Sequence, residues 1–141
     1  MRLLNVQHLL RLAWAAPASM LGLGLAGLAL CAGARAHRHR GVLEVSGGRL
    51  DGLLDGRHPL LHFDAITLGH VVLGRNPGLM AVLRAHERVH VRQYERWGVF
   101  FFPAYLGSSL WQWLRGRDPY RDNRFEREAF REAARVPGAD A

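Results

Sequence analysis

Cysteine is almost absent from this chain of 141 residues, which contains a single one, Cys31. One cysteine excludes a framework of internal disulfide bonds and leaves the redox compartment of the protein undecided. Internal repeats and low-complexity linkers are also missing. A chain of this length allows one modest domain, with part of it spent on an apolar N-terminal stretch.

Acidic side chains are scarce as well, with 12 against 19 basic ones, and the resulting net charge of +7 is carried by arginine. Such a balance attracts anionic surfaces, either nucleic acid or the headgroups of acidic lipids. No motif in the sequence indicates a nucleic-acid-binding fold, and the arginines flank apolar segments. The expected partner is therefore an acidic membrane surface and not nucleic acid.

Charge is absent between Arg11 and Arg35, where Leu12 to Ala34 form a stretch rich in Leu, Ala and Gly. A stretch of this length can span a bilayer as a helix. One interpretation of residues 1–36 is a retained membrane anchor. The alternative is a signal peptide cleaved at the A-x-A-like site Ala34-Arg35-Ala36, which would lead to an exported protein.

Arginine and histidine alternate directly after this stretch, from Arg35 to Arg40. A basic cluster in this place resembles the flank of a stop-transfer segment, which favours the anchor. His37 and His39 belong to the cluster and are expected to be solvated.

Short strands and turns are predicted for residues 41–75. Gly41–Val45 is a candidate strand, and Asp51-Gly52 and Asp55-Gly56 are typical of turns. Ala65–Gly74 is rich in β-branched residues and bounded by glycine, which predicts a strand. The edge of such a strand could hold an extended peptide. His70, within it, is expected to be packed or exposed and not a metal ligand.

Residues His86-Glu87-Arg88-Val89-His90 form an HExxH motif. On an α-helix, residues four apart lie on the same face, so both imidazoles can reach one metal ion. Glu87 is then placed to act on a water molecule bound to that ion. This spacing is typical of zinc hydrolases, although a surface helix with polar residues at these positions would show it too.

The residues around the motif predict a helix over about 77–97. Asn76-Pro77 is typical of an N-cap followed by proline at the first helical position, and Gly98 ends the run. One apolar stripe recurs at helical spacing and includes both histidines: Leu79, Val82, Leu83, His86, His90 and Tyr94. Unpaired imidazoles on such a face would be costly, and a metal ion would satisfy them. Another face carries arginines expected to contact solvent or lipid headgroups: Arg84, Arg88, Arg92 and Arg96.

A second apolar stretch, Gly98–Leu114, is marginal for a membrane span because as a helix it reaches only about 25 Å. Pro103 is expected to break or kink it near its start. Its tryptophans and the arginines that follow resemble the belt of residues at a membrane interface. A buried core helix is the alternative.

A turn at residues 118–123 precedes a final helix predicted from about Arg124 to Arg135. Glu126, in its first turn, has two candidate roles. With Asn123 it fits a capping box, or it is the third protein ligand of a metal held by the two motif histidines. Glu128 points to another side of the helix, so only one of the two glutamates can face the site.

If Glu126 is a ligand, the stretch before it cannot cross the membrane once. Bonds of about 2.0–2.2 Å require the histidines and Glu126 to meet, whereas a complete crossing would leave Glu126 about 30 Å away. Two crossings would need far more apolar residues than the stretch contains. Gly98–Leu114 is therefore expected to lie in the interface, to dip and return at Pro103, or to pack inside the domain.

The motif and the later glutamate resemble the gluzincin-type HExxH zinc metallopeptidases, whose third ligand is a glutamate on a later helix. The nearest likeness is to their membrane-associated group and to small bacterial membrane proteins of HExxH type. In that group the later helix carries Phe-Glu-x-x-Ala-Asp, where this chain has Phe-Glu-Arg-Glu-Ala-Phe at 125–130. The resemblance implies zinc bound by His86, His90 and Glu126, with Glu87 as general base. Phe130 replaces the aspartate, which would otherwise support the ligands.

The sequence thus predicts an α+β fold with an N-terminal signal or anchor helix at 1–36. A small β region, the zincin-like HExxH helix and further helices then form a metallopeptidase-like domain at 41–135. The expected function is zinc-dependent hydrolysis of a peptide or protein substrate, by resemblance at the bacterial inner membrane. The alternative is a non-enzymatic membrane protein with a structural or degenerate metal site. The candidates for oxyanion stabilisation are Tyr94, Tyr105, Tyr120 and His70.

Overall fold

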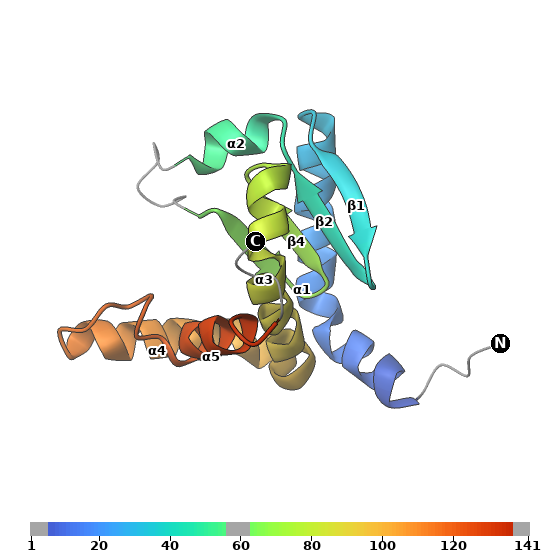
Figure 1. Cartoon of the computed structure of the whole chain (residues 1–141). Coiled ribbons are helices and arrows are strands. Elements are labelled where there is room, and N and C mark those ends of the chain that lie inside the picture. The colour runs from blue at the N-terminus through green and yellow to red at the C-terminus, as the bar shows by residue number, and fades with distance from the viewer. Residues whose placement is uncertain (1–5, 56–62, 137–141) are drawn as a thin grey trace.

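The computed structural model describes residues 6–55 and 63–136 of the chain. It confirms an α+β fold in which an apolar N-terminal helix precedes a small four-stranded sheet and further helices follow. In chain order the elements are α1 (Val6–Cys31), β1 (Arg35–His39), β2 (Val42–Ser46), α2 (Arg49–Leu54), β3 (Ala65–Leu68), β4 (Val71–Gly74), α3 (Pro77–Trp97), the 3-10 helix η1 (Gly98–Phe100), α4 (Phe101–Leu114) and α5 (Arg124–Ala133). The sheet lies between two helices, with α1 behind it and α3 in front (Figure 1).

The sheet has the strand order β1-β2-β4-β3, with β2 and β4 parallel and the two outer pairs antiparallel. Because side chains alternate along a strand, β4 packs against both helices. Val71 and Leu73 pack with alanines of α1, whereas Val72 packs with Met80 and Val91 of α3. The sheet therefore separates two hydrophobic cores.

The strand predicted over Ala65–Gly74 is two strands, β3 and β4, joined by a tight turn at Gly69-His70. Gly69 has a φ of 61°, and a Cβ there would overlap Ser19 of α1. The glycine therefore permits both the turn and the close approach of the helix. The prediction of one continuous strand was wrong because this turn contains no strong turn dipeptide.

The basic segment after α1 was predicted as the flank of an anchor, and it forms the edge strand β1, paired with β2. His37 is exposed, as expected for a solvated side chain, while His39 is half-buried. The strand predicted at Gly41–Val45 is confirmed as β2 (Val42–Ser46). Asp51-Gly52 lies inside α2 and not in a turn, and Asp55-Gly56 extends outside the described residues.

One side of α1 packs against the sheet through the small residues Gly22, Ala26 and Ala29, while Ala15 is buried against Tyr94, Phe101 and Phe125. A Cβ on Gly22 would lie only 2.8 Å from Cβ of Val71, so the helix backbone touches β4 directly. By length and composition α1 is apolar enough to be a membrane span or a signal sequence. Its buried side is nevertheless part of the hydrophobic core of the sheet.

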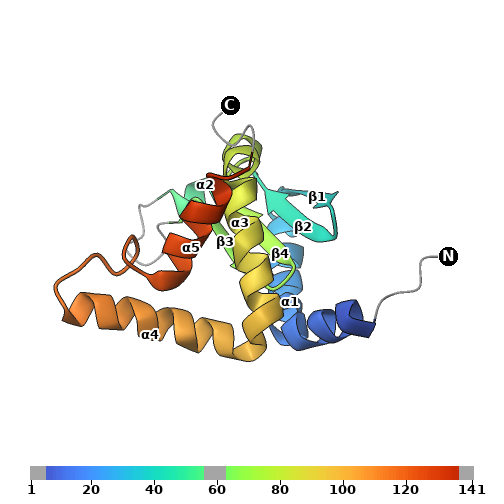
Figure 2. The ribbon, with the colours of Figure 1, turned by 60° about the horizontal axis from the view of Figure 1, so that its bottom comes forward.

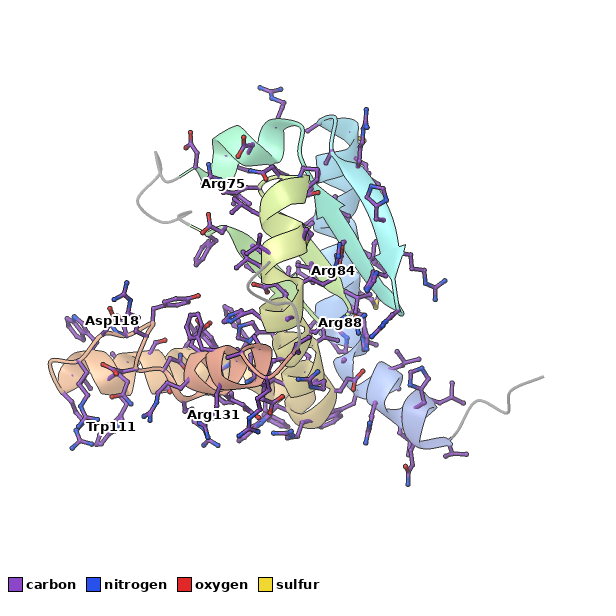
Figure 3. The ribbon with its side chains drawn as sticks, in the orientation of Figure 1. Arg75, Arg84, Arg88, Trp111, Asp118 and Arg131 are labelled. Carbon is purple, nitrogen blue, oxygen red and sulfur yellow. The ribbon has the colours of Figure 1, made fainter. Side chains whose placement is uncertain are left out.

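The helix predicted over 77–97 is confirmed as α3. The Asn76 side chain accepts a hydrogen bond from the backbone N–H of Leu79, Pro77 opens the helix, and Gly98 ends it with a φ of 56°. Two arginines of its polar face, Arg84 and Arg88, are half-buried and contact other parts of the protein, whereas Arg92 and Arg96 are exposed as expected. Arg84 pairs with Glu44, and Arg88 donates to the carbonyl of His39 (Figure 3). Two more, Arg92 and Arg96, pair with Glu132 and Glu128 of α5.

The apolar stretch Gly98–Leu114 forms η1 and α4, and α4 passes through Pro103 without ending. Pro103 lies in the first turn of α4, where backbone N–H groups have no partner within the helix, so its missing donor costs little. The expected break was therefore wrong, and so was the alternative of a buried core helix. Only Phe101 of α4 is buried.

Candidate metal centre

Three donor side chains from α3 and α5 meet at one point. The Nε2 atoms of His86 and His90, one helical turn apart, are 3.1 Å from each other. The Glu126 carboxylate places one oxygen 3.1 Å from Nε2 of His86 and the other 3.4 Å from Nε2 of His90. All three residues are buried, and their donor atoms lie within 4.8 Å of one another. This group could hold a metal ion.

The spacing of these atoms suits the ligands of one shared metal ion as well as it suits direct contacts. Ligands bound to zinc at about 2.0–2.1 Å in a tetrahedron lie about 3.3 Å apart, close to the distances found here. Oε2 of Glu126 is buried without a hydrogen-bond partner, although it faces an imidazole nitrogen. A cation between the three side chains would satisfy it, since buried polar atoms are otherwise costly to leave unpaired.

Asn123 places Glu126 by capping the helix that carries it. The Asn123 side chain accepts from the N–H of Phe125 and donates to the carbonyl of Tyr105 and the hydroxyl of Ser109 on α4. The predicted N-cap is therefore present. The carboxylate of Glu126 turns toward the histidines, so the reciprocal half of a capping box is not formed by it.

Glu128, the other glutamate of this helix, lies outside the cluster. It accepts a hydrogen bond from Nε2 of Gln93 and pairs with Arg96, both on α3. These contacts hold α5 against α3. Between the two candidates, the structure brings Glu126 and not Glu128 to the histidines.

Two further side chains contact the donors directly: Gln93, which the sequence did not indicate, and Tyr105, which it indicated only as a candidate for oxyanion stabilisation. Nδ1–H of His90 donates to Oε1 of Gln93 at 2.8 Å, which leaves Nε2 with the lone pair that a metal would bind. The hydroxyl of Tyr105 donates to Oε1 of Glu126 at 2.6 Å. Gln93 lies three residues after His90, a spacing that places both on one helix face and could have signalled the contact.

Glu87 is buried beside the histidines, and its Oε2 accepts a hydrogen bond of 2.6 Å from the Thr67 hydroxyl. Thr67 belongs to β3, the strand at the edge of the sheet. This contact joins residues twenty positions apart and was not predicted from the sequence. The hydrogen bond holds the Glu87 carboxylate of α3 against β3.

An aromatic wall covers the outer side of the cluster. The Phe130 ring lies 4.6 Å from that of His86, and Tyr120 meets Phe130 edge to face. The aspartate of the resembled pattern is thus replaced by an apolar contact with a ligand. Phe130 and Tyr120 are 48% and 47% exposed, so this wall faces solvent on its far side.

The charges around the imidazoles favour a cation. Burial opposes ionisation of Glu126, but the adjacent imidazoles of His86 and His90 hold its pKa below the ordinary value. Burial lowers the pKa of His90, but its hydrogen bond to Glu126 and the nearby charge of Glu87 outweigh this effect and raise it. Two carboxylates therefore supply negative charge to one small, poorly solvated volume.

Of the four candidates for oxyanion stabilisation, two lie near the cluster. Burial and the neighbouring Glu126 raise the pKa of both Tyr105 and Tyr120, so each hydroxyl stays protonated. Tyr94 packs instead in an aromatic core against Phe101. His70 contacts Ser19 and Glu95, as expected for a packed histidine.

No protein-family model matches the chain, and neither a curated protein nor a solved structure shows significant similarity to it. A cavity of about 890 Å³ is present elsewhere, between α1, α2, β3 and β4. None of its lining residues belongs to the cluster.

Proposed function

We propose that the chain is a zincin-like, membrane-associated zinc hydrolase that cleaves peptide bonds. The observation that carries this proposal is the convergence of His86, His90 and Glu126, with Glu87 buried beside them. Two imidazoles and one carboxylate form the donor set of catalytic zinc sites of the gluzincin type, which keep a fourth position for water or substrate. Within the described residues, three such donors meet at this point.

The residues around the proposed zinc site have distinct roles in this reaction. A bound zinc ion would supply Lewis-acid polarisation of the scissile carbonyl and make water more acidic. Glu87 accepts the proton of the attacking water and then gives it to the leaving amine. Thr67 occupies Oε2 of Glu87, so the proton is taken up by Oε1. Tyr120 is the better placed of the two tyrosines to donate to an oxyanion, because Tyr105 is already bonded to Glu126.

The sheet supports a peptide substrate. β3 is an edge strand, and Thr67 on it contacts the proposed general base. An extended chain that added to this edge would form backbone hydrogen bonds whatever its sequence. Its scissile bond would then lie close to Glu87.

Replacement of Glu87 by glutamine tests this function. The amide keeps the size of the side chain and its contact with Thr67 but cannot accept the proton from water. We expect Glu87→Gln to retain about one zinc per chain and to lose at least about 100-fold in hydrolysis of a fluorogenic peptide mixture. Zinc is measured by atomic absorption on the same sample. Hydrolysis that survives this change, at unchanged zinc content, would exclude the mechanism.

The alternative, a metal site that only stabilises the fold, is favoured by the burial of the cluster and by the Phe130 ring over His86. Structural zinc sites are closed by a fourth protein ligand. The two functions differ in one measurement, because a structural site would bind zinc in both the wild type and Glu87→Gln and would show hydrolysis in neither.

A further inference from the structure

The helix α4 has a polar stripe with Ser108, Ser109 and Gln112, but most of its other side chains are apolar and exposed. Phe102, Trp113 and Leu114 are 53%, 64% and 65% exposed, and only Phe101 is buried. α5 and the turn before it cover one side of α4 through Asn123. Large apolar patches on a protein surface mark sites of contact with a partner or a membrane.

The exposed side of α1 continues this apolar surface. Trp14 of α1 contacts Phe100 of η1, with ring centroids 6.1 Å apart, and the two side chains are 44% and 60% exposed. Figure 2 shows α4 and the first turns of α1 extending in opposite directions along the lower edge of the molecule. The exposed apolar residues of α1 are Val6, Leu9, Leu10, Trp14, Met20, Leu21, Leu23, Leu25, Leu28 and Leu30.

A complete crossing of the bilayer by α1 conflicts with its packing. The buried side of α1 from Gly22 to Ala29 contacts the sheet, and Ala15 packs against Tyr94, Phe101 and Phe125, all along the segment that would lie in hydrocarbon. The sheet would then enter the bilayer with the open edge of β1, which carries exposed Arg35 and Arg38. Unpaired backbone groups and arginines at an open edge are excluded from hydrocarbon.

Positive charges beside the apolar surface favour a membrane that contains anionic lipids. The outer end of α4 is followed by exposed arginines, namely Arg115, Arg117 and Arg121. The Arg115 guanidinium lies 5.5 Å from the centre of the Trp111 ring, at the end of α4 farthest from α3 (Figure 3). Tryptophan and arginine side by side are typical of the level of the headgroups. Clustered arginines add attraction to anionic lipids.

We propose that α4, η1 and the exposed side of α1 form one docking surface for an anionic phospholipid bilayer, which the chain binds from one face without crossing it. Apolar side chains enter the headgroup and upper acyl region while the sheet, α3 and α5 stay in water. The inference refines the membrane association in the proposed function but does not require the metal. It places the metal centre, through α5, beside the membrane, so that chains near its surface would be the accessible substrates.

The first experiment measures on which face of the membrane α1 begins and ends. Cys31 is replaced by serine in the full-length chain, and single cysteines are placed at His8, near the start of α1, and at Arg38, after its end. Sealed vesicles from the expressing cells are treated with a membrane-impermeant maleimide, with and without prior permeabilisation. We expect both positions to react from the same face. Labelling from opposite faces would show that α1 crosses the bilayer and would overturn the proposal.

The second experiment measures the docking surface. The full chain, diluted from detergent, is sedimented with vesicles of phosphatidylcholine, with or without phosphatidylglycerol. We expect stronger binding to the anionic vesicles and a loss of about tenfold or more in a variant with Trp113→Ser and Leu114→Ser. Leu53→Ser with Val82→Ser, two other exposed apolar positions, is the control and should bind as the wild type does.

Equal binding to neutral vesicles, or unchanged binding of the Trp113 and Leu114 variant, would overturn the proposal. Zinc content is measured in every sample, because it reports on the metal centre alone. A chain that binds zinc but does not bind vesicles through α4 or α1 would refute this inference. It would not contradict the proposed hydrolase. A chain that docks on vesicles but binds no zinc would support this inference and refute the proposed hydrolase.

Discussion

Glu126 and Glu128 lie on the same helix but make different contacts, which gives a matched test of the metal centre. Glu126 faces both histidine nitrogens, whereas Glu128 binds Gln93 and Arg96. We expect Glu126→Gln to lower zinc affinity by at least about 100-fold, because two protein ligands rarely hold zinc. Glu128→Gln should bind zinc nearly as the wild type does. Competition with a chromophoric zinc chelator measures both, and a loss confined to Glu128→Gln would reverse the assignment.

Gln93 acts on the metal only through His90, so its replacement should weaken binding without abolishing it. Its Oε1 holds Nδ1–H of the imidazole, and its Nε2 donates to the Phe125 carbonyl and to Glu128. We expect Gln93→Met to lower zinc affinity about 10–100-fold. Gln93→Glu, which keeps the acceptor for His90, should recover part of this loss. Equal affinity in both variants and the wild type would show that Gln93 does not orient the ligand.

At the scale of residues, the sequence predicted the contacts that lie within one helix turn. The spacing of His86 and His90 follows from helix geometry, and the structure brings their Nε2 atoms together. Helix phase predicted that one of the two glutamates would face them. Which glutamate faces the histidines depends on Gln93 and Arg96, because they bind Glu128 and are distant from it in sequence. Thr67, and the contact of Tyr105 with Glu126, were missed for the same reason.

The packing of α1 on the sheet can be tested with two glycines of the same helix. A Cβ on Gly22 would approach Val71 and the Leu68 carbonyl to 2.8 and 2.9 Å, whereas Gly24 has open space around it. Alanine favours a helix over glycine by about 1 kcal/mol, so Gly24→Ala should be neutral or stabilising. Gly22→Ala should destabilise the protein by about 1–3 kcal/mol through overpacking.

The measurement is thermal unfolding of the full chain in detergent, followed by circular dichroism. If α1 were removed as a signal peptide, neither glycine would be part of the mature protein, and the two variants would unfold like the wild type. A lower melting temperature in Gly22→Ala alone would confirm that α1 remains part of the core.

At the scale of elements, local signals predicted helices better than strands. Asn76-Pro77 and Gly98 mark both ends of α3, and the structure confirms them. β1 is a sequence of arginine, alanine and histidine without β-branched residues, and it is a strand because β2 pairs with it. Pro103 was expected to interrupt α4, but a proline in the first turn does not oppose a helix.

At the scale of the whole molecule, the metal centre joins two parts of the chain that α4 separates. α3 packs on the sheet, whereas α5 reaches α3 only after the whole length of α4 and the following turn. Hydrophobic pattern predicted which face of α3 is apolar but not this return path, because the path depends on contacts between distant residues. If Glu126 is a ligand, α4 cannot cross a membrane completely, and this stays a prediction. In the structure, α5 packs on α3.

Removal of zinc should therefore lower the stability of the whole fold. A ligand that binds only the folded state stabilises it by about 2.7 kcal/mol at a concentration 100 times its Kd, which for a chain of this size raises the melting temperature by about 5–10 °C. We expect the wild type to lose this increment when zinc is chelated and to regain it when zinc is restored. Glu126→Gln, which keeps the fold but lacks a ligand, should show little change between the two conditions. Unfolding followed by circular dichroism measures both proteins, and an equal response to chelation in the two would mean that zinc acts elsewhere than at this centre.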